Sequence, residues 1–178
     1  MLVLYEFGNS VCCQKVRLVL YEKGAVWESR QVNLFRSEQY DPEYLKLNPK
    51  GLVPTLVHDG RPIIESTVIC EYLEAIFPEP CLMPAGAYER ARVRLWSKAV
   101  DEGLHEGVTE ISFSAMFRER MKNMSETERE VRFRNVGDPK RHDRFVSTYE
   151  FGMALGVGYA QRNERKKSFT MKRKKPAR

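Results

Sequence analysis

The sequence predicts an α/β domain of element order βαβαββα, with a four-stranded mixed sheet, followed by an all-α domain. Two observations support this fold class. Short alternating apolar segments and helix-periodic segments succeed one another through residues 1–77. After the proline-rich stretch 78–84, strand signals cease and helical spacing continues. A hydrophobic fraction of 42% over 178 residues is enough for a core and excludes a wholly disordered chain.

The first strand and the first helix are separated by a short turn that ends in a capping residue. Residues 2–7 alternate as a strand, and Gly8 and Asn9 interrupt it. Ser10 is a favourable N-cap for the helix that follows. The expected buried stripe of this helix consists of Cys12, Val16, Val19 and Leu20. Gly24 follows at the place where a helix C-terminus favours positive φ.

A second strand and two more helices are predicted in this region. Residues 26–34 predict a strand, which should lie parallel to the first because a right-handed crossover joins such units. Residues 37–47 predict a short helix interrupted at Pro42. A further helix opens at Glu65 and Ser66. Its expected buried stripe consists of Ile69, Tyr72, Leu73 and Ile76.

The last two strands are predicted as a hairpin. Residues 55–58 and 61–64 are short β-rich runs on either side of Asp59-Gly60, a dipeptide typical of a type I′ turn. Pro62 has no N–H for a ladder bond, so its strand is expected at the edge of the sheet.

The linker, the helical domain and the tail differ in composition. We expect domains at 1–77 and 87–161, a linker at 78–86, and a basic, disordered tail at 162–178. Of the net charge of +6, the tail supplies nine Lys or Arg against one Glu, whereas the rest holds 21 against 23 acidic residues. We do not expect nucleic-acid binding, although a nucleic-acid-binding tail and a shifted reading frame remain alternatives for this segment.

Three helices are predicted in the second domain. The first begins near Ala87, with apolar residues spaced for a long helix at Val93, Trp96, Val100, Leu104 and Ile111. Ser125 and Glu128 form a capping-box pattern for the second. Asp138-Pro139 predicts the start of a third, which would run to about residue 161.

The sequence also limits the compartment and the metal chemistry. No apolar run approaches the ~20 residues of a membrane helix, and the N-terminus lacks signal-peptide features. The four cysteines are not spaced as a disulfide framework, and no zinc-binding spacing occurs. We therefore expect a cytoplasmic protein with reduced thiols, no membrane association and no metal.

Three segments together resemble the serine-type glutathione transferase superfamily. They are residues 10–20 (SVCCQKVRLVL), 48–56 (NPKGLVPTL) and 64–73 (IESTVICEYL), with the Asp-Gly hairpin between the last two. The resemblance implies a thioredoxin-like glutathione-binding domain over 1–77 and a helical second domain, here short for the family.

The resemblance assigns the catalytic role to Ser10, whose hydroxyl would donate to the sulfur of glutathione. A thiol with a pKa of about 8.5 is only a few per cent ionised at pH 7, and lowering that pKa by two units needs about 2.7 kcal/mol. One hydrogen bond to a charged group contributes about 1.5–3 kcal/mol, and a helix N-terminus adds to it. The serine acts as a donor, so it needs no general base.

The resemblance also assigns the groups that would bind glutathione. Val53-Pro54 would be a cis peptide that presents the Val53 backbone to the cysteinyl part, with an ordinary trans proline as the alternative. Glu65 and Ser66 would bind the γ-glutamyl end, although Ser66 could serve only as an N-cap. Lys50 is the candidate for the glycyl carboxylate.

Two cysteines follow the catalytic position. Because Ser10 replaces the first member of a Cys-x-x-Cys pair, thioredoxin-type disulfide reduction is disfavoured. Cys12 is expected to be buried, and Cys13 could form a mixed disulfide with glutathione if it were exposed.

The functional prediction is a cytoplasmic, homodimeric detoxification enzyme that conjugates glutathione to a small electrophile. The alternative is a non-catalytic module in which the same fold binds partners as a scaffold, with or without glutathione.

Overall fold

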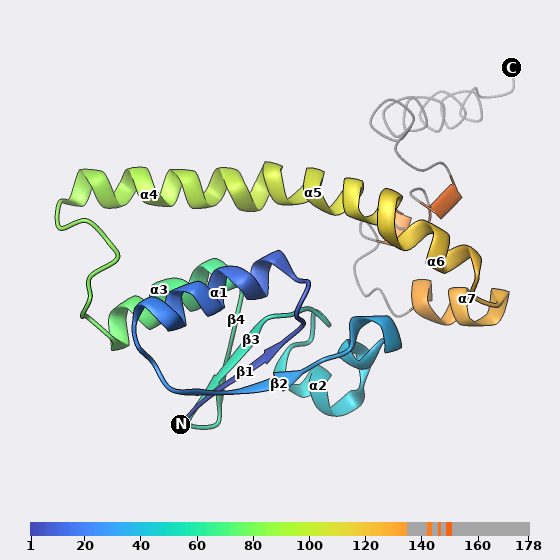
Figure 1. Ribbon diagram of the computed structural model, residues 1–178, viewed down its shortest axis with the longest axis horizontal. Helices are drawn as coiled ribbons and strands as arrows, with labels where there is room; N and C mark the ends of the chain where they lie inside the picture. The colour runs from blue at the N-terminus through green and yellow to red at the C-terminus, as the bar shows by residue number, and fades with distance from the viewer. Residues whose placement is uncertain (135–141, 144–145, 147–148, 151–178) are drawn as a thin grey trace, which may run out of the picture. The chain divides into compact units, whose positions relative to one another are not determined.

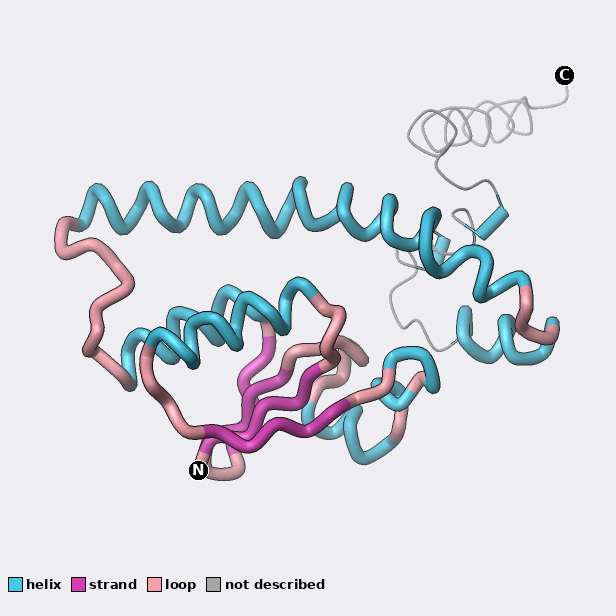
Figure 2. Tube along the Cα trace, viewed as in Figure 1, coloured by secondary structure: helices cyan, strands magenta, loops and turns pink. Residues whose placement is uncertain are grey.

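The computed structural model describes residues 1–134, 142–143, 146 and 149–150 (Figures 1 and 2). The chain divides into two compact units, Met1–Val100 and Asp101–Arg178. The expected domain limits of 1–77 and 87–161 remain predictions. The expected tail at 162–178 and most of the predicted helix at 138–161 lie outside the described residues.

A four-stranded mixed sheet forms the centre of the first unit, as predicted. The strands are β1 (Leu2–Glu6), β2 (Trp27–Gln31), β3 (Thr55–His58) and β4 (Arg61–Ile64), in the spatial order β2-β1-β3-β4. Strand β1 is parallel to β2 and antiparallel to β3, and β3 is antiparallel to β4. Strand β4 is therefore an edge strand, which confirms the position expected from Pro62.

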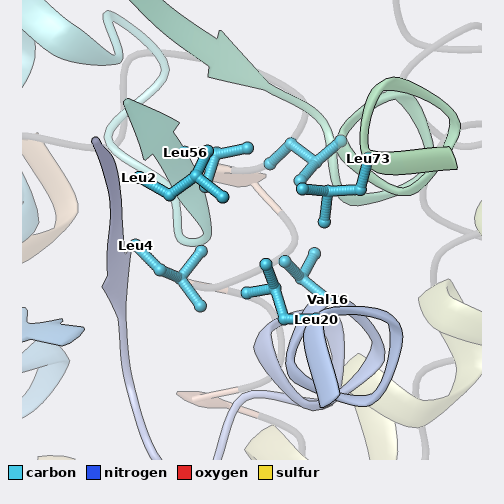
Figure 3. Packing of buried hydrophobic residues seen from close by; sticks show 7 residues of the cluster. Leu2, Leu4, Val16, Leu20, Leu56 and Leu73 are labelled. Atoms are coloured by element: carbon cyan, nitrogen blue, oxygen red, sulfur yellow. The ribbon is translucent and has the colours of Figure 1, made fainter. Parts of the chain in front are cut away.

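Helices α1 (Val11–Glu22) and α3 (Ser66–Ile76) pack side by side on one face of this sheet (Figure 1). Leucines of β1 and β3 point toward them and close the main core (Figure 3). The buried members of the core are Leu2, Leu4, Val16, Leu20, Leu56, Ile69 and Leu73. On the other side of β1, the ring of Tyr5 contacts that of Tyr44, on α2 (Pro42–Leu47).

Local backbone signals account for the turns between these elements. Ser10 is the N-cap of α1, and Gly24 has a φ of 58° just after that helix. Asp59 and Gly60 have φ values of 47° and 78°, as a type I′ turn requires. The expected helix at 37–47 consists of a 3₁₀ turn, η2 (Glu38–Tyr40), and then α2, because Pro42 starts a new helix. A further 3₁₀ turn, η1 (Leu34–Arg36), precedes it.

Helical structure begins again at α4 (Ala87–Ala99) and continues to residue 122. The consecutive elements after α4 are the π-helical η3 (Val100–Leu104), α5 (His105–Ser112), the π-helical η4 (Phe113–Phe117) and α6 (Arg118–Lys122). This confirms the long helix expected near Ala87, with two π-helical segments that periodicity did not predict. Ser125 and Glu128 form the predicted capping box of α7 (Glu126–Arg134). Within the described residues, no helix has the length and hydropathy to cross a membrane.

A buried ion pair ties the end of α1 to α3 and to the proline-rich segment. The Lys23 ammonium, with a fully buried side chain, lies 2.5 Å from a Glu74 carboxylate oxygen and donates to the Pro80 carbonyl at 2.7 Å. Glu74 also accepts from the backbone N–H groups of Leu82 and Met83. Burial raises the Glu74 pKa, but the hydrogen bonds that Glu74 accepts outweigh burial and lower the pKa below its usual 4.5.

The substitution Glu74→Gln should lower the free energy of unfolding by about 1.5–3 kcal/mol, because the buried Lys23 charge loses its charged partner. Since the folded pKa of Glu74 is lowered, the stability that it contributes is full above pH 4.5 and declines as the pH falls through the folded pKa. Urea unfolding at several pH values would measure both effects. The control Glu43→Gln removes an exposed pair with Lys46 and should change stability little. Equal losses in the two variants, or an unchanged acid dependence in Glu74→Gln, would contradict this account.

Candidate functional site

The sheet register brings three separate segments to one edge of the sheet, the border at which β1 and β4 end and β3 begins. Tyr5 pairs with Thr55, and Thr55 pairs with Ile64, so one row crosses β1, β3 and β4. Strand β1 ends one residue beyond this row, β4 ends in it, and β3 begins in it. The predicted site residues lie in the segments that follow β1, precede β3 or follow β4. They are therefore gathered at this edge by topology, where α1 and α3 also begin.

Ser10 lies in a short turn with fixed geometry. Its backbone N–H donates to the Phe7 carbonyl at 3.0 Å, and its Oγ accepts from the Cys13 N–H at 3.3 Å. The side chain is half-buried. Because the oxygen is the acceptor in the capping bond, the hydroxyl hydrogen can donate to another group. The arrangement places a hydroxyl donor at the positive end of a 12-residue helix.

The loop before β3 is held from beneath by three buried polar side chains. The Tyr44 hydroxyl donates to the Leu52 carbonyl at 2.5 Å and lies 2.9 Å from the Thr55 hydroxyl. The Asn48 side-chain amide donates to the same carbonyl at 2.9 Å, and its oxygen accepts from the Lys50 N–H at 3.1 Å. Burial raises the pKa of Tyr44 to about 12, so the phenol stays protonated and can keep donating.

Gly51 and the Val53-Pro54 peptide shape the rest of the same loop. Gly51 has a φ of 58°, and a Cβ there would lie 2.7 Å from the Tyr40 ring. The Val53-Pro54 peptide is cis, as the resemblance implied, and Pro54 is buried. The loop therefore admits only a residue without a side chain at position 51.

Glu65 and Ser66 lie at the junction of β4 and α3. Glu65 is the N-cap residue and has an unusual backbone, with φ 69° and ψ 112°. Non-glycine residues held at positive φ are uncommon and gather at functional sites. Ser66 is buried in the first turn of α3, so the reading in which Ser66 is only the N-cap is wrong.

Two groups assigned to opposite ends of glutathione pair with each other. The Lys50 ammonium lies 2.6 Å from a Glu65 carboxylate oxygen, and both side chains are about half exposed. The structure thus brings the expected cation and the expected anion of the site to the same place, across the loop before β3 and the start of α3.

Of the two cysteines that follow Ser10, the second is the more deeply buried. Cys13 is fully buried and Cys12 only partly, so the prediction for Cys12 is wrong. The buried row of α1 is Cys13, Val16 and Leu20, because Cys13 and not Cys12 turns toward the sheet. Burial raises the pKa of the Cys13 thiol, and its Sγ accepts from the Phe7 N–H at 3.5 Å. The exposure on which a mixed disulfide at Cys13 depended is absent.

Sequence reasoning missed one buried acid beside the Ser10 turn. Glu6, at the end of β1, is only 3% exposed and forms an ion pair with Arg17 of α1. It also accepts from the Ser29 hydroxyl at 2.7 Å. The alternation of side chains along β1 could have revealed it, because this alternation places Glu6 on the same inward face of the strand as Leu2 and Leu4.

This combination of fold and site defines a thioredoxin-like domain of the kind found in glutathione transferases. The sequence profile of the glutathione S-transferase N-terminal domain matches residues 4–81. Among solved structures, that of the beta-etherase LigF from Sphingobium sp. strain SYK-6 has a TM-score of 0.77 and 35% identity, covering 90% of this chain and 71% of that one. The chain belongs to the glutathione transferase superfamily.

Curated relatives extend over different lengths of the chain. The protein LigF of Sphingobium sp. is 41% identical over 143 residues, which are 79% of this chain and 56% of that protein. The maleylacetoacetate isomerase of Dictyostelium discoideum is 44% identical over 94 residues, or 52% of this chain and 43% of that protein. The chain thus spans about half the length of these curated relatives.

The substitution Gly51→Ala should destabilise the chain by about 2 kcal/mol or more, because it adds a steric collision to the cost of a left-handed backbone. Gly24→Ala is the matched control, since Gly24 has the same φ of 58° but open space around its Cβ position. We expect about 1 kcal/mol for the control. Denaturant titrations of both variants measure the difference. Equal losses in the free energy of unfolding would contradict the expected collision, because they would show that the Tyr40 ring moves aside.

Proposed function

We propose that this chain binds glutathione at the edge formed by β1, β3 and β4 and activates its thiol through Ser10. The observation that carries the proposal is the Ser10 hydroxyl at the N-terminus of α1, on the edge that also holds Val53, Glu65 and Ser66. A donor and a helix N-terminus both favour a thiolate over a thiol.

The three parts of the tripeptide have matching groups along this edge. The Val53 backbone suits the cysteinyl unit, which would add to it as an extended strand does. The γ-glutamyl carboxylate suits the N-terminus of α3 at Ser66, and its ammonium suits Glu65. Lys50 suits the glycyl carboxylate. Because these two charged groups of glutathione lie at opposite ends of the tripeptide, its binding would separate Lys50 from Glu65 and replace one partly exposed ion pair with two.

For the reaction, we propose attack of the glutathione thiolate on a carbon that carries an ether oxygen. The match to LigF, a beta-etherase, covers 79% of this chain, whereas that to the isomerase covers 52%. In the proposed step a carbon–sulfur bond forms and the carbon–oxygen bond breaks. The oxygen departs with the electron pair of that bond and takes a proton from water, which leaves a thioether and an alcohol or phenol.

The proposal includes a cytoplasmic homodimer with a detoxifying role, as the family resemblance implies. The competing proposal is a scaffold that uses the fold without turnover, supported by the apolar and partly exposed Leu52 next to Val53. Retention on immobilised glutathione followed by turnover of a nitrophenyl ether separates the two: retention without release of nitrophenol favours the scaffold.

The substitution Ser10→Ala should raise the thiol pKa of bound glutathione by about 1–2 units, because the thiolate loses its donor. It should also cost about 1 kcal/mol of stability through the lost cap. Thiolate absorbance in the ultraviolet, followed against pH with saturating glutathione, measures the pKa.

Ser10→Asp is the matched variant, because a carboxylate still caps the helix but repels a thiolate. We expect wild-type stability with a raised thiol pKa. If either variant ionises bound glutathione as the wild type does, Ser10 is not the activating group.

The substitution Glu65→Gln should weaken glutathione binding about fivefold, because the ligand's ammonium loses its charged partner. The deaminated analogue of glutathione should bind to the wild type and to the variant equally. Calorimetric titration of both ligands measures this, with Glu43→Gln as a control of equal charge change. A similar loss for both ligands would mean that Glu65 does not contact the ammonium.

A further inference from the structure

The turn that carries Ser10 is held by side chains of the helix that follows it. Arg17 forms an ion pair with Glu6 through one guanidinium nitrogen, and its second terminal nitrogen donates to the Gly8 carbonyl at 3.2 Å. Arg17 therefore joins the end of β1 to the turn between Glu6 and Ser10. The turn is closed further by the hydrogen bond from the Ser10 N–H to the Phe7 carbonyl.

Glu6 is a costly residue to place at this position. Its side chain is 3% exposed, whereas that of Arg17 is 21% exposed. Removing a carboxylate from water costs several kcal/mol, and an ion pair in the interior often does no better than a well-packed apolar pair. Stability alone therefore gives little reason for the pair.

The geometry supplies a different reason. A guanidinium is a planar fork whose nitrogens donate in fixed directions, so an arginine held by a buried carboxylate defines where a second acceptor must lie. Here that second acceptor is Gly8, two residues before Ser10. The Ser29 hydroxyl donates to the other carboxylate oxygen of Glu6 at 2.7 Å, which fixes the carboxylate in turn.

We propose that Glu6 and Arg17 are positioning residues that hold the Gly8 carbonyl and thereby aim the Ser10 hydroxyl at the thiol. This inference rests on the proposed function of Ser10. Neither residue touches the substrate, and both act through the turn. A displacement of about 1 Å at a catalytic group can reduce a rate by up to about a hundredfold, so a modest shift of the turn is enough.

The first test is Arg17→Lys, which keeps a cation beside Glu6 but removes the fork that reaches Gly8. We expect an unchanged affinity for glutathione, a raised thiol pKa of bound glutathione and a roughly tenfold lower kcat with the nitrophenyl ether. The matched control is Arg94→Lys, because Arg94 makes a two-nitrogen contact with Glu71, at 3.1 Å for each bond, away from the turn. The control should leave the thiol pKa and kcat unchanged.

The second test separates positioning from stability. The double variant Glu6→Met with Arg17→Met removes the charges together, so we expect thermal stability close to the wild type and a raised thiol pKa. A wild-type thiol pKa in Arg17→Lys or in the double variant would overturn the inference while leaving the role of Ser10 intact. A wild-type chain that binds glutathione without lowering its thiol pKa would overturn the proposed function and this inference with it.

Discussion

Strand β3 runs antiparallel to both of its neighbours, β1 and β4, and the rest of the site depends on this pairing. Because the two outer strands of this trio run in the same direction, both end where β3 begins. The helices that follow them, α1 and α3, must then start at the same edge. Two positive helix ends, one turn and one loop meet there because of the strand directions.

The side chains that fix this edge are polar, and each forms a hydrogen bond with the backbone. Ser10 caps α1, Asn48 and Tyr44 hold the Leu52 carbonyl, and Arg17 holds the Gly8 carbonyl. Each contributes on the order of 1 kcal/mol to stability. Their larger effect is on position, because a loop whose carbonyls are held by buried donors has few alternative conformations.

Much of the fold could be predicted from local sequence signals, and the site only in part. Ser10 as a cap and Asp59-Gly60 as a turn were predictable because one residue type at one backbone position determines each. The burial of Cys13 in place of Cys12 was not, since neighbouring helix positions differ by only 100° and the direction of the sheet selects between them.

Contacts between distant residues were not predictable from the sequence. Glu6 could be placed on the inward face of its strand, but its partner Arg17 is defined only once α1 packs on the sheet. The pairing of Lys50 with Glu65 depends in the same way on where the loop before β3 meets α3. The last predicted helix, from residue 138, falls largely outside the described residues.

The Lys50–Glu65 pair has a consequence for how a charged ligand reaches the site. With the two charges 2.6 Å apart, their fields largely cancel beyond a few ångströms, and no excess of either sign extends from them into solvent. Electrostatic steering by this pair is therefore weak, and the pair itself adds little ionic-strength dependence to the rate of ligand encounter. Recognition of charge at Lys50 and Glu65 begins only after contact, when a zwitterionic ligand can offer each of them a new partner.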